Sequence, residues 1–169
     1  MAVKVGLTEE EYLRTSFPGV DSEFRDGDIV ERAIPDVPHS TAQMGSAGFF
    51  LQLRKQEGLP FFPLPELRHQ VRPGRYLIPD VAVHWPNPPA EDVPAHPPLI
   101  VIEVLSPEDR MSDVIAKFQE YVAWGVPHVW LIDPRSRQLS IYDRQGLHHV
   151  DEFPVPEANR PLRVADIFD

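Results

Sequence analysis

Hydrophobic and polar residues repeat with two different periods along this chain, which predicts a mixture of strands and helices. Short apolar runs bounded by proline, glycine or aspartate are typical of buried strands. Such runs predict strands at about 61–66, 68–73, 77–84 and 99–105, with two more in HVWLID and QLSIYD. A β-hairpin is predicted where SEFR and DIVER flank Asp26-Gly27, a favourable two-residue turn.

Apolar residues spaced three and four apart predict the helices. Thr8 and Glu11 form a capping box that begins a short helix over Glu9–Arg14. A longer helix is predicted from Ser40 or Thr41 to about Glu57, with Gly58 ending it. Its expected buried stripe comprises Met44, Ala47, Phe50 and Leu51, with Phe49 as a further member.

Two further helical segments follow in the second half of the chain. Ser112 is expected to cap a helix that runs to Trp124 and stops at Gly125. The C-terminal RVADIFD is expected to form a short closing helix or turn. Strands and helices in this order predict an α/β fold of mixed type. The 169 residues suit one domain over 1–169, because neither a repeat nor a flexible linker divides them.

Composition narrows the class of protein further. Proline is unusually frequent, with 20 residues, and is concentrated in 85–98, which predicts a stiff extended connector. The chain has 0 cysteines, which excludes disulfides and cysteine zinc sites and fits a reducing compartment. The start MAVKVGLTEEEYL is too charged for a signal peptide, and no apolar run approaches the length of a membrane span. We therefore expect a cytoplasmic protein without a membrane partner.

The charge balance weighs against a broad nucleic-acid interface. Lys and Arg total 16 against 26 Asp and Glu, a net charge of −10, whereas nucleic-acid binders usually carry a basic face. An acidic enzyme acting on a small substrate is the simpler interpretation. The middle of the chain is nevertheless locally basic, through Arg54, Lys55, Arg68, His69, Arg72 and Arg75.

Two acidic residues interrupt runs that otherwise predict buried strands. Asp80 lies in YLIPDVAVHW and Glu103 lies in LIVIEVLSP. An ionised carboxylate deprived of water and of a partner is costly, so a pair in neighbouring strands predicts a divalent cation between them. Oxygen ligands favour Mg²⁺ or Mn²⁺. Because clustered carboxylates repel one another, Asp80→Asn is expected to raise stability in the absence of metal.

Lys117 lies in the second turn of the helix that follows Glu103. It shares a face with Tyr121, beside the apolar stripe, so its side chain can reach back over the end of the Glu103 strand. A lysine there completes the outline of a phosphodiester-cleaving site. The alternative is an exposed lysine whose stem covers the edge of the core.

A set of segments in fixed order carries a family resemblance. The set comprises EFRDGDIVE, His39, IPDVAV, IEVLSPEDR and DVIAKFQEYVAWGVPHVWLIDP, and its most specific part is 102–134. From Thr8 to Phe168 the chain resembles the Uma-type restriction endonuclease family of the PD-(D/E)XK nuclease superfamily. The resemblance implies a restriction-endonuclease-like fold, in which helices flank a central mixed β-sheet with a metal site at one edge.

The resemblance also implies roles for individual residues. Asp80 and Glu103 match the two acidic residues of the motif and would bind Mg²⁺ or Mn²⁺ together with the main-chain carbonyl of Val104. The motif's lysine is expected two residues after Glu103, where this chain has Leu105. Lys117 matches the position on the following helix to which that lysine has moved in the family.

Two more residues match the family with less specific motifs. Glu23 resembles an extra acidic residue that faces the site, and the alternative is a surface carboxylate paired with Arg25 or Arg32. His39 resembles a contact to phosphate or water, although a simple role at the start of its helix is the plainer interpretation.

The implied activity is hydrolysis of phosphodiester bonds of nucleic acid, with DNA favoured, by a metal-dependent endonuclease. Two other classes stay open. One is a catalytically inactive nucleic-acid- or protein-binding module, which the displaced lysine and the net charge favour. The other is a metal-dependent hydrolase of a small phosphorylated substrate, against which the lack of a glycine-rich phosphate loop counts. A homodimer is compatible with cutting both strands of a duplex.

Overall fold

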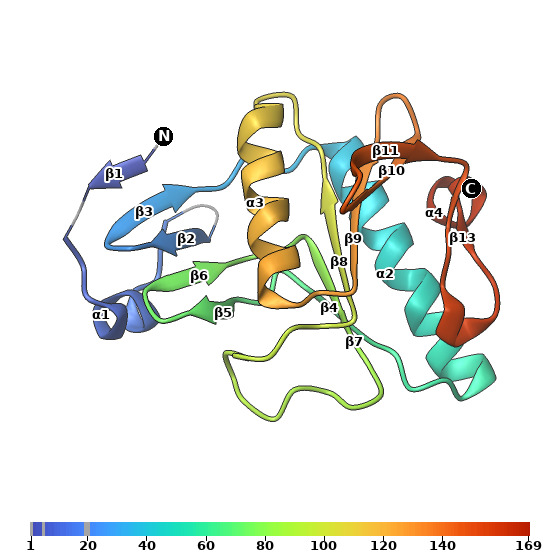
Figure 1. Cartoon of the computed structure of the whole chain (residues 1–169), viewed down its shortest axis with the longest axis horizontal. Helices are drawn as coiled ribbons and strands as arrows, with labels where there is room; N and C mark the ends of the chain where they lie inside the picture. The colour runs from blue at the N-terminus through green and yellow to red at the C-terminus, as the bar shows by residue number, and fades with distance from the viewer. Residues whose placement is uncertain (1, 5, 19–20) are drawn as a thin grey trace.

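The chain folds into two larger sheets, one small sheet and flanking helices, in a computed structural model that describes residues 2–4, 6–18 and 21–169 (Figure 1). The elements in chain order are β1 (Ala2–Lys4), α1 (Glu9–Arg14), β2 (Ser22–Arg25), β3 (Asp28–Glu31), α2 (Val37–Glu57), β4 (Phe62–Pro65), β5 (His69–Arg72), β6 (Arg75–Leu77), β7 (Val81–His84), β8 (Ile100–Val104), α3 (Met111–Trp124), β9 (His128–Asp133), β10 (Gln138–Asp143), β11 (Gly146–Val150), β12 (Glu152–Phe153), the 3₁₀ turn η1 (Pro156–Ala158), β13 (Leu162–Arg163) and α4 (Val164–Phe168). The mixed α/β class is confirmed.

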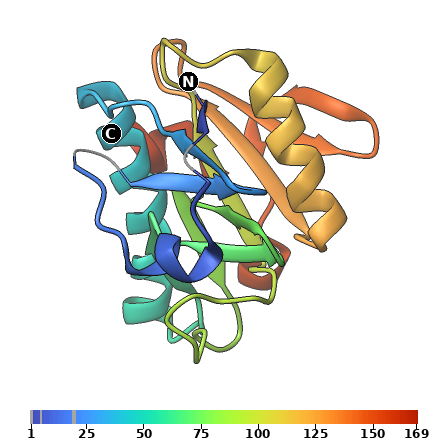
Figure 2. The same cartoon turned by 90° about the vertical axis from the view of Figure 1, so that its left-hand side faces the viewer.

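The two larger sheets lie side by side in Figure 1, and Figure 2 shows the molecule with the five-stranded sheet facing the viewer. One has five strands in the order β1-β3-β2-β6-β5, and the other has six in the order β11-β10-β9-β8-β7-β4. A two-stranded sheet, β12-β13, completes the set. Strands β8 and β9 pair in parallel, while β7 pairs with β8 antiparallel, so the six-stranded sheet is mixed.

Alternation along β8 assigns its residues to the two faces of the six-stranded sheet. Ile100, Ile102 and Val104 pack in the core cluster that contains the buried side chains of α2 and α4. Val101 packs in the cluster that contains Phe118 and Tyr121 of α3. Glu103 follows Val101 by two residues and therefore faces α3. Helix α3 covers one face of the sheet, and α2 with α4 covers the other.

The predicted strand over 77–84 is wrong, because the chain makes two strands in different sheets there. Strand β6 ends at Leu77 and β7 begins at Val81. Pro79 has no N–H to donate to a strand ladder, and the N–H of Ile78 donates to the Glu23 carboxylate instead. The segment 78–80 is therefore the crossing point between the two sheets.

Helix α2 begins earlier than predicted. Its N-cap is Asp36, whose side chain accepts a hydrogen bond from the N–H of His39 at 3.0 Å, so the expected caps Ser40 and Thr41 lie inside the helix. The expected stripe is also partly wrong, because Met44 is 73% exposed and Leu51 is 37% exposed. The buried face of α2 comprises His39, Ala42, Ser46, Phe49, Phe50 and Leu53.

Most other local expectations are confirmed. The capping box of α1 forms as predicted, and Gly58 and Gly125 end their helices in the left-handed conformation. Helix α3 begins at Met111 with Arg110 as its N-cap, so Ser112 is not the cap. Residues 85–98 form neither helix nor strand. Among the described helices, none has the length and apolar character needed to cross a membrane.

Candidate active site

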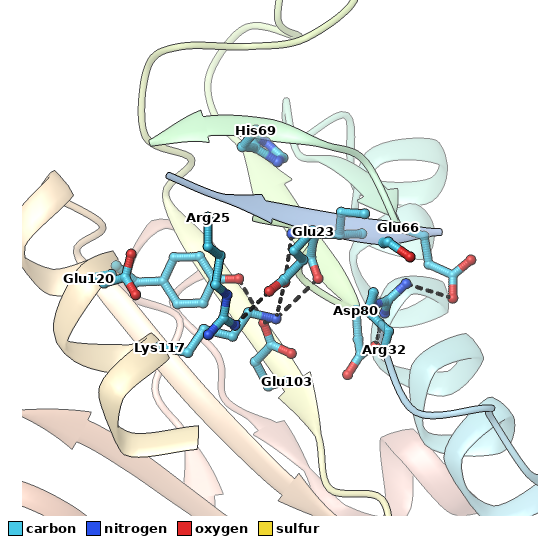
Figure 3. A network of polar contacts seen from close by, with 12 residues as sticks. Glu23, Arg25, Arg32, Glu66, His69, Asp80, Glu103, Lys117 and Glu120 are labelled. Carbon is cyan, nitrogen blue, oxygen red and sulfur yellow. Dashed lines mark hydrogen bonds and ion pairs between the residues drawn. The ribbon is translucent and has the colours of Figure 1, made fainter. Parts of the chain in front are cut away.

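Lys117 places its ammonium group at the centre of a buried polar cluster (Figure 3). Nζ lies 2.8 Å from Oε1 of Glu103 and 2.8 Å from Oε1 of Glu23, and it donates to the carbonyl of Ile78 at 3.2 Å. The lysine side chain is 12% exposed, so the alternative of an exposed surface lysine is wrong. Its position one turn before Tyr121 on α3 brings it over β8, as the helical spacing indicates.

Glu103 is the carboxylate of the cluster whose charged form is most disfavoured by its surroundings. Oε1 accepts a hydrogen bond from the Tyr121 hydroxyl at 2.7 Å and also contacts Lys117. Burial raises the pKa of Glu103 to about 7, and the neighbouring charges of Asp80 and Glu23 add to this effect against the opposing pull of Lys117. Its second oxygen, Oε2, accepts no hydrogen bond from the described residues.

Asp80 lies in the crossing segment between the two sheets, and its charge is compensated from several directions. Oδ1 accepts from Arg32 at 2.6 Å, and Oδ2 accepts from the backbone N–H of Val104 at 2.7 Å. Nε2 of His39 lies 3.4 Å from Oδ2. Burial would raise the pKa of Asp80, but the His39 hydrogen bond and the Arg32 charge outweigh it, and the pKa is lowered.

Glu23 lies on β2 and is buried, with a side chain only 3% exposed. Oε2 accepts from Arg25 at 2.7 Å, and Oε1 accepts from the N–H of Ile78 at 3.0 Å. Although burial acts in the opposite direction, Lys117 and Arg25 lower the pKa of Glu23 to about 2. The pairing with Arg25 was one predicted alternative, but Glu23 is not a surface residue. It holds Lys117 in place from the side opposite Glu103.

His39 occupies the third position of α2 and points at Asp80. Burial lowers the pKa of His39, yet the hydrogen bond and charge of Asp80 reverse this effect and raise it. Nδ1 of His39 is buried without a hydrogen-bond partner among the described residues. The position at a helix start is confirmed, and the ring also belongs to the carboxylate cluster.

A cavity of about 350 Å³ opens over these side chains. It is lined by Glu23, Arg25, Val30, Glu31, Arg32, Ala33, His39, Asp80, Glu103, Val104, Leu105, Ser106, Glu108, Asp109, Arg110, Asp113, Val114, Lys117 and Leu131. Carboxylates outnumber cationic side chains on this wall, so the cavity lining favours a cation over an anion. An anionic substrate would therefore need a positive charge placed there beforehand.

Asp80 and Glu103 supply part of the oxygen donor set that a hard divalent cation requires. Asp80 and Glu103 present carboxylate oxygens to one cavity, and Oε2 of Glu103 is free of hydrogen bonds from the described residues. Within 2–4, 6–18 and 21–169, however, no three His, Cys, Asp or Glu side chains form a group that could hold a metal. Lys117 stands between Glu23 and Glu103, so Glu23 acts as a partner of the lysine. The expected Val104 carbonyl would be the third ligand.

Sequence reasoning missed two members of this site. Arg32 was considered as a surface partner of Glu23, yet its side chain is 13% exposed and pairs with Asp80. Asp109 lines the cavity and accepts from the N–H of Ser106 at 2.7 Å, and burial raises its pKa. Strand and helix periods could not find either residue, because both lie just outside regular elements.

A mixed six-stranded sheet between helices, beside an antiparallel five-stranded sheet and with buried carboxylates and a lysine where the two meet, is the architecture of the restriction-endonuclease-like fold class. A family model described as "Uma2: Putative restriction endonuclease" matches residues 9–168. The chain belongs to this Uma2 family.

One solved structure supports the fold assignment. It is the crystal structure of a "putative nuclease belonging to DUF820" from Anabaena variabilis, with a TM-score of 0.81 and 24% sequence identity. The match covers 96% of this chain and 97% of that chain. At this level of identity the likeness concerns the fold. The comparison with curated proteins gave no match.

Proposed function

We propose that this chain is a Mg²⁺- or Mn²⁺-dependent endonuclease that hydrolyses phosphodiester bonds of nucleic acid, with DNA as the favoured substrate. The observation that carries the proposal is the Lys117 ammonium group held between two buried carboxylates on the wall of the cavity that also contains Asp80. Membership of the Uma2 family supports the same reaction class.

Asp80, Glu103 and the Val104 carbonyl are the groups that would hold the cation, which lowers the pKa of a bound water when present. Asp80 is already ionised, because Arg32 and His39 favour its charged form. Lys117 remains protonated, since Glu103 and Glu23 outweigh its burial and raise its pKa. A fixed positive charge next to the cavity stabilises negative charge that develops on a phosphate.

One observation favours the inactive binding module as a second candidate. The three N–H groups of Lys117 already have three acceptors, in Glu23, Glu103 and the Ile78 carbonyl. The lysine must release one of them before it can donate a hydrogen bond to a phosphate or a water. A protein that never releases one would bind its partner without cutting it.

A cleavage assay separates the two candidates. Single- and double-stranded DNA and RNA are incubated with the protein in Mg²⁺, Mn²⁺ or EDTA. The nuclease proposal expects cleavage with metal, none in EDTA and none with Asp80→Asn. Binding of a nucleic acid without cleavage in any metal would support the inactive module. Cleavage that persists in Asp80→Asn would show that the site described here does not perform it.

A further inference from the structure

Arg32 lies where the cavity most needs a positive charge. It follows β3 directly, and its side chain is 13% exposed. Nη2 lies 2.6 Å from Oδ1 of Asp80, and Nη1 lies 3.5 Å from Oε1 of Glu66 (Figure 3). The Asp80 side chain is only 5% exposed, and a buried carboxylate is tolerated when a cation and hydrogen bonds compensate it.

The Arg32 guanidinium contacts Asp80, the carboxylate that would bind the metal. Oδ2 of Asp80 is engaged by the Val104 N–H, so Oδ1 is the oxygen that both Arg32 and an incoming cation would approach. A guanidinium and a divalent ion repel each other at such close range. Glu103, by contrast, keeps Oε2 free of hydrogen bonds from the described residues. The competition therefore concerns Asp80.

We propose that Arg32 is a positioning residue that stands in for the metal: it holds Asp80 in the metal-free protein and competes with Mg²⁺ or Mn²⁺ for that carboxylate. The inference rests on the proposed function, because it takes Asp80 as a metal ligand. Glu66 provides a second anchor, so the guanidinium can release Asp80 and remain paired. Arg32 thereby sets how much metal the site requires before it is loaded.

Arg32→Met tests this inference, since methionine keeps much of the arginine stem and removes its charge. In EDTA the variant should melt at a lower temperature than the wild type, because Asp80 remains buried without its main cation. Calorimetric titration should show Mn²⁺ binding about tenfold more tightly, the scale of one hydrogen bond to a charged group. Mn²⁺ should also raise the melting temperature of the variant more than that of the wild type.

Arg25→Met is the matched control. Arg25 lines the same cavity and pairs with Glu23 at 2.7 Å, so this variant loses the same charge from a carboxylate that Lys117 also holds. Its Mn²⁺ affinity should change by less than about threefold, the effect of a charge that acts without contact. Equal tightening in both variants would mean a general charge effect and would overturn the inference. Weaker or unchanged binding in Arg32→Met would overturn it as well.

Two further results keep the test decisive. If Arg32→Met does not fold in EDTA, circular dichroism after addition of Mn²⁺ should show recovery of the fold, and no recovery counts against the inference. Asp80→Asn identifies the ligand. If it binds Mn²⁺ as the wild type does, the metal site of the proposed function is wrong. If Asp80→Asn no longer binds Mn²⁺ while Arg32→Met binds Mn²⁺ no more tightly than the wild type, the proposed metal site is supported. The proposed role of Arg32 is then wrong.

Discussion

At the scale of single residues, the two carboxylates proposed as metal ligands have opposite electrostatic characters. Burial and acidic neighbours raise the pKa of Glu103 from an ordinary 4.5 to about 7. The pKa of Asp80 is lowered, because His39 and Arg32 outweigh the effect of burial. Without metal, ionisation of Glu103 therefore lowers the stability of the folded protein, whereas ionisation of Asp80 does not. The stabilising substitution expected from clustered carboxylates belongs at Glu103 instead of Asp80.

Glu103→Gln should accordingly raise the melting temperature at pH 8 in EDTA, while Asp80→Asn should lower it. A raised pKa gives stability that is complete below about 4.5 and is lost as pH rises through about 7. The wild type should therefore lose stability across this window relative to Glu103→Gln, at about 1.4 kcal/mol per unit of pKa difference. Thermal melts at pH 5 and pH 8 measure both variants. Destabilisation by Glu103→Gln at pH 8 would contradict this assignment.

The position of Lys117 was predictable, but its confinement was not. Helical spacing placed its side chain over β8, and the family resemblance supplied its role. Its second carboxylate partner, Glu23, comes from a hairpin far away in sequence, and no local period reports such a contact. For the same reason Arg32 entered the sequence analysis only as an alternative partner of a surface Glu23. Contacts between distant segments decide which charged side chains are buried, and the sequence alone does not give them.

Lys117→Met should lower both cleavage and stability. Removal of one preorganised charge costs about 10²–10³-fold in rate, and removal of one partner from a buried ion pair costs about 3–5 kcal/mol. The exposed Lys55 on α2 provides the matched control, because Lys55→Met should change stability by less than about 0.5 kcal/mol. Urea unfolding and cleavage rates in Mn²⁺ measure the two effects. Equal rates for wild type and Lys117→Met would remove the lysine from the reaction.

At the scale of elements, helix ends marked by glycine were predicted well, as was the start of α1, whereas the starts of α2 and α3 were not. Gly58 and Gly125 adopt positive φ, which few other residues do without cost, so they mark an end from sequence alone. Several residues near the N-terminus of α2 could serve as its N-cap. Asp36 is the N-cap, because its side chain accepts a hydrogen bond from the N–H of His39. The wrong buried stripe has a separate cause, because packing against α4 and the sheet decides which face of α2 is covered.

Helix α4 packs closely against α2 at Gly45. Substitution of this glycine tests the packing of the two helices. A Cβ at Gly45 would collide with the main-chain carbonyl of Ile167, whereas one at Gly48 meets nothing within 4 Å among the described residues. Gly45→Ala should destabilise the protein by about 1–3 kcal/mol through overpacking. Gly48→Ala should stabilise it by up to about 1 kcal/mol, because alanine favours helix. Urea unfolding of both variants checks the opposite signs, and equal effects would contradict this packing.

The strand boundary at Pro79 shows a further limit of pattern reasoning. The run 77–84 is apolar enough for one buried strand, but only its first residue, Leu77, belongs to β6, and its last four residues form β7. A run of apolar residues does not reveal that its two ends join different sheets. Proline was the available signal, since it cannot donate to a ladder, and it marks the place where Asp80 leaves the strand pattern.

At the scale of the whole molecule, a pair of buried histidines links the two larger sheets. Nε2 of His69 on β5 lies 3.0 Å from Nε2 of His84 on β7. Nδ1 of His69 donates to the Leu67 carbonyl, so Nε2 of the neutral ring accepts from His84. Burial lowers the pKa of each ring to about 4. The pair is therefore stable in its neutral form.

Acid should consequently loosen the contact between the sheets. Below a pH of about 6.5 the two histidines bind protons in the unfolded chain but stay neutral in the folded protein. The free energy of unfolding therefore falls as pH drops from about 6.5 to about 4. The double variant His69→Gln, His84→Gln should show a flatter decline over this range. Unfolding free energies at pH 7, 5.5 and 4 provide the comparison, in which titration of other groups cancels. Parallel curves for the two proteins would exclude the histidine pair as the cause.

The candidate site, which includes the crossing segment 78–80, is built from residues that the ribosome makes at different times. Glu23, Asp80, Glu103 and Lys117 come from β2, the crossing segment, β8 and α3, and the lysine leaves the ribosome last. Until α3 has emerged, the carboxylates Glu23 and Glu103 have no ammonium group between them. For the nuclease proposed here, a chain that ends before α3 would lack Lys117, the positive charge on which the proposed cleavage depends.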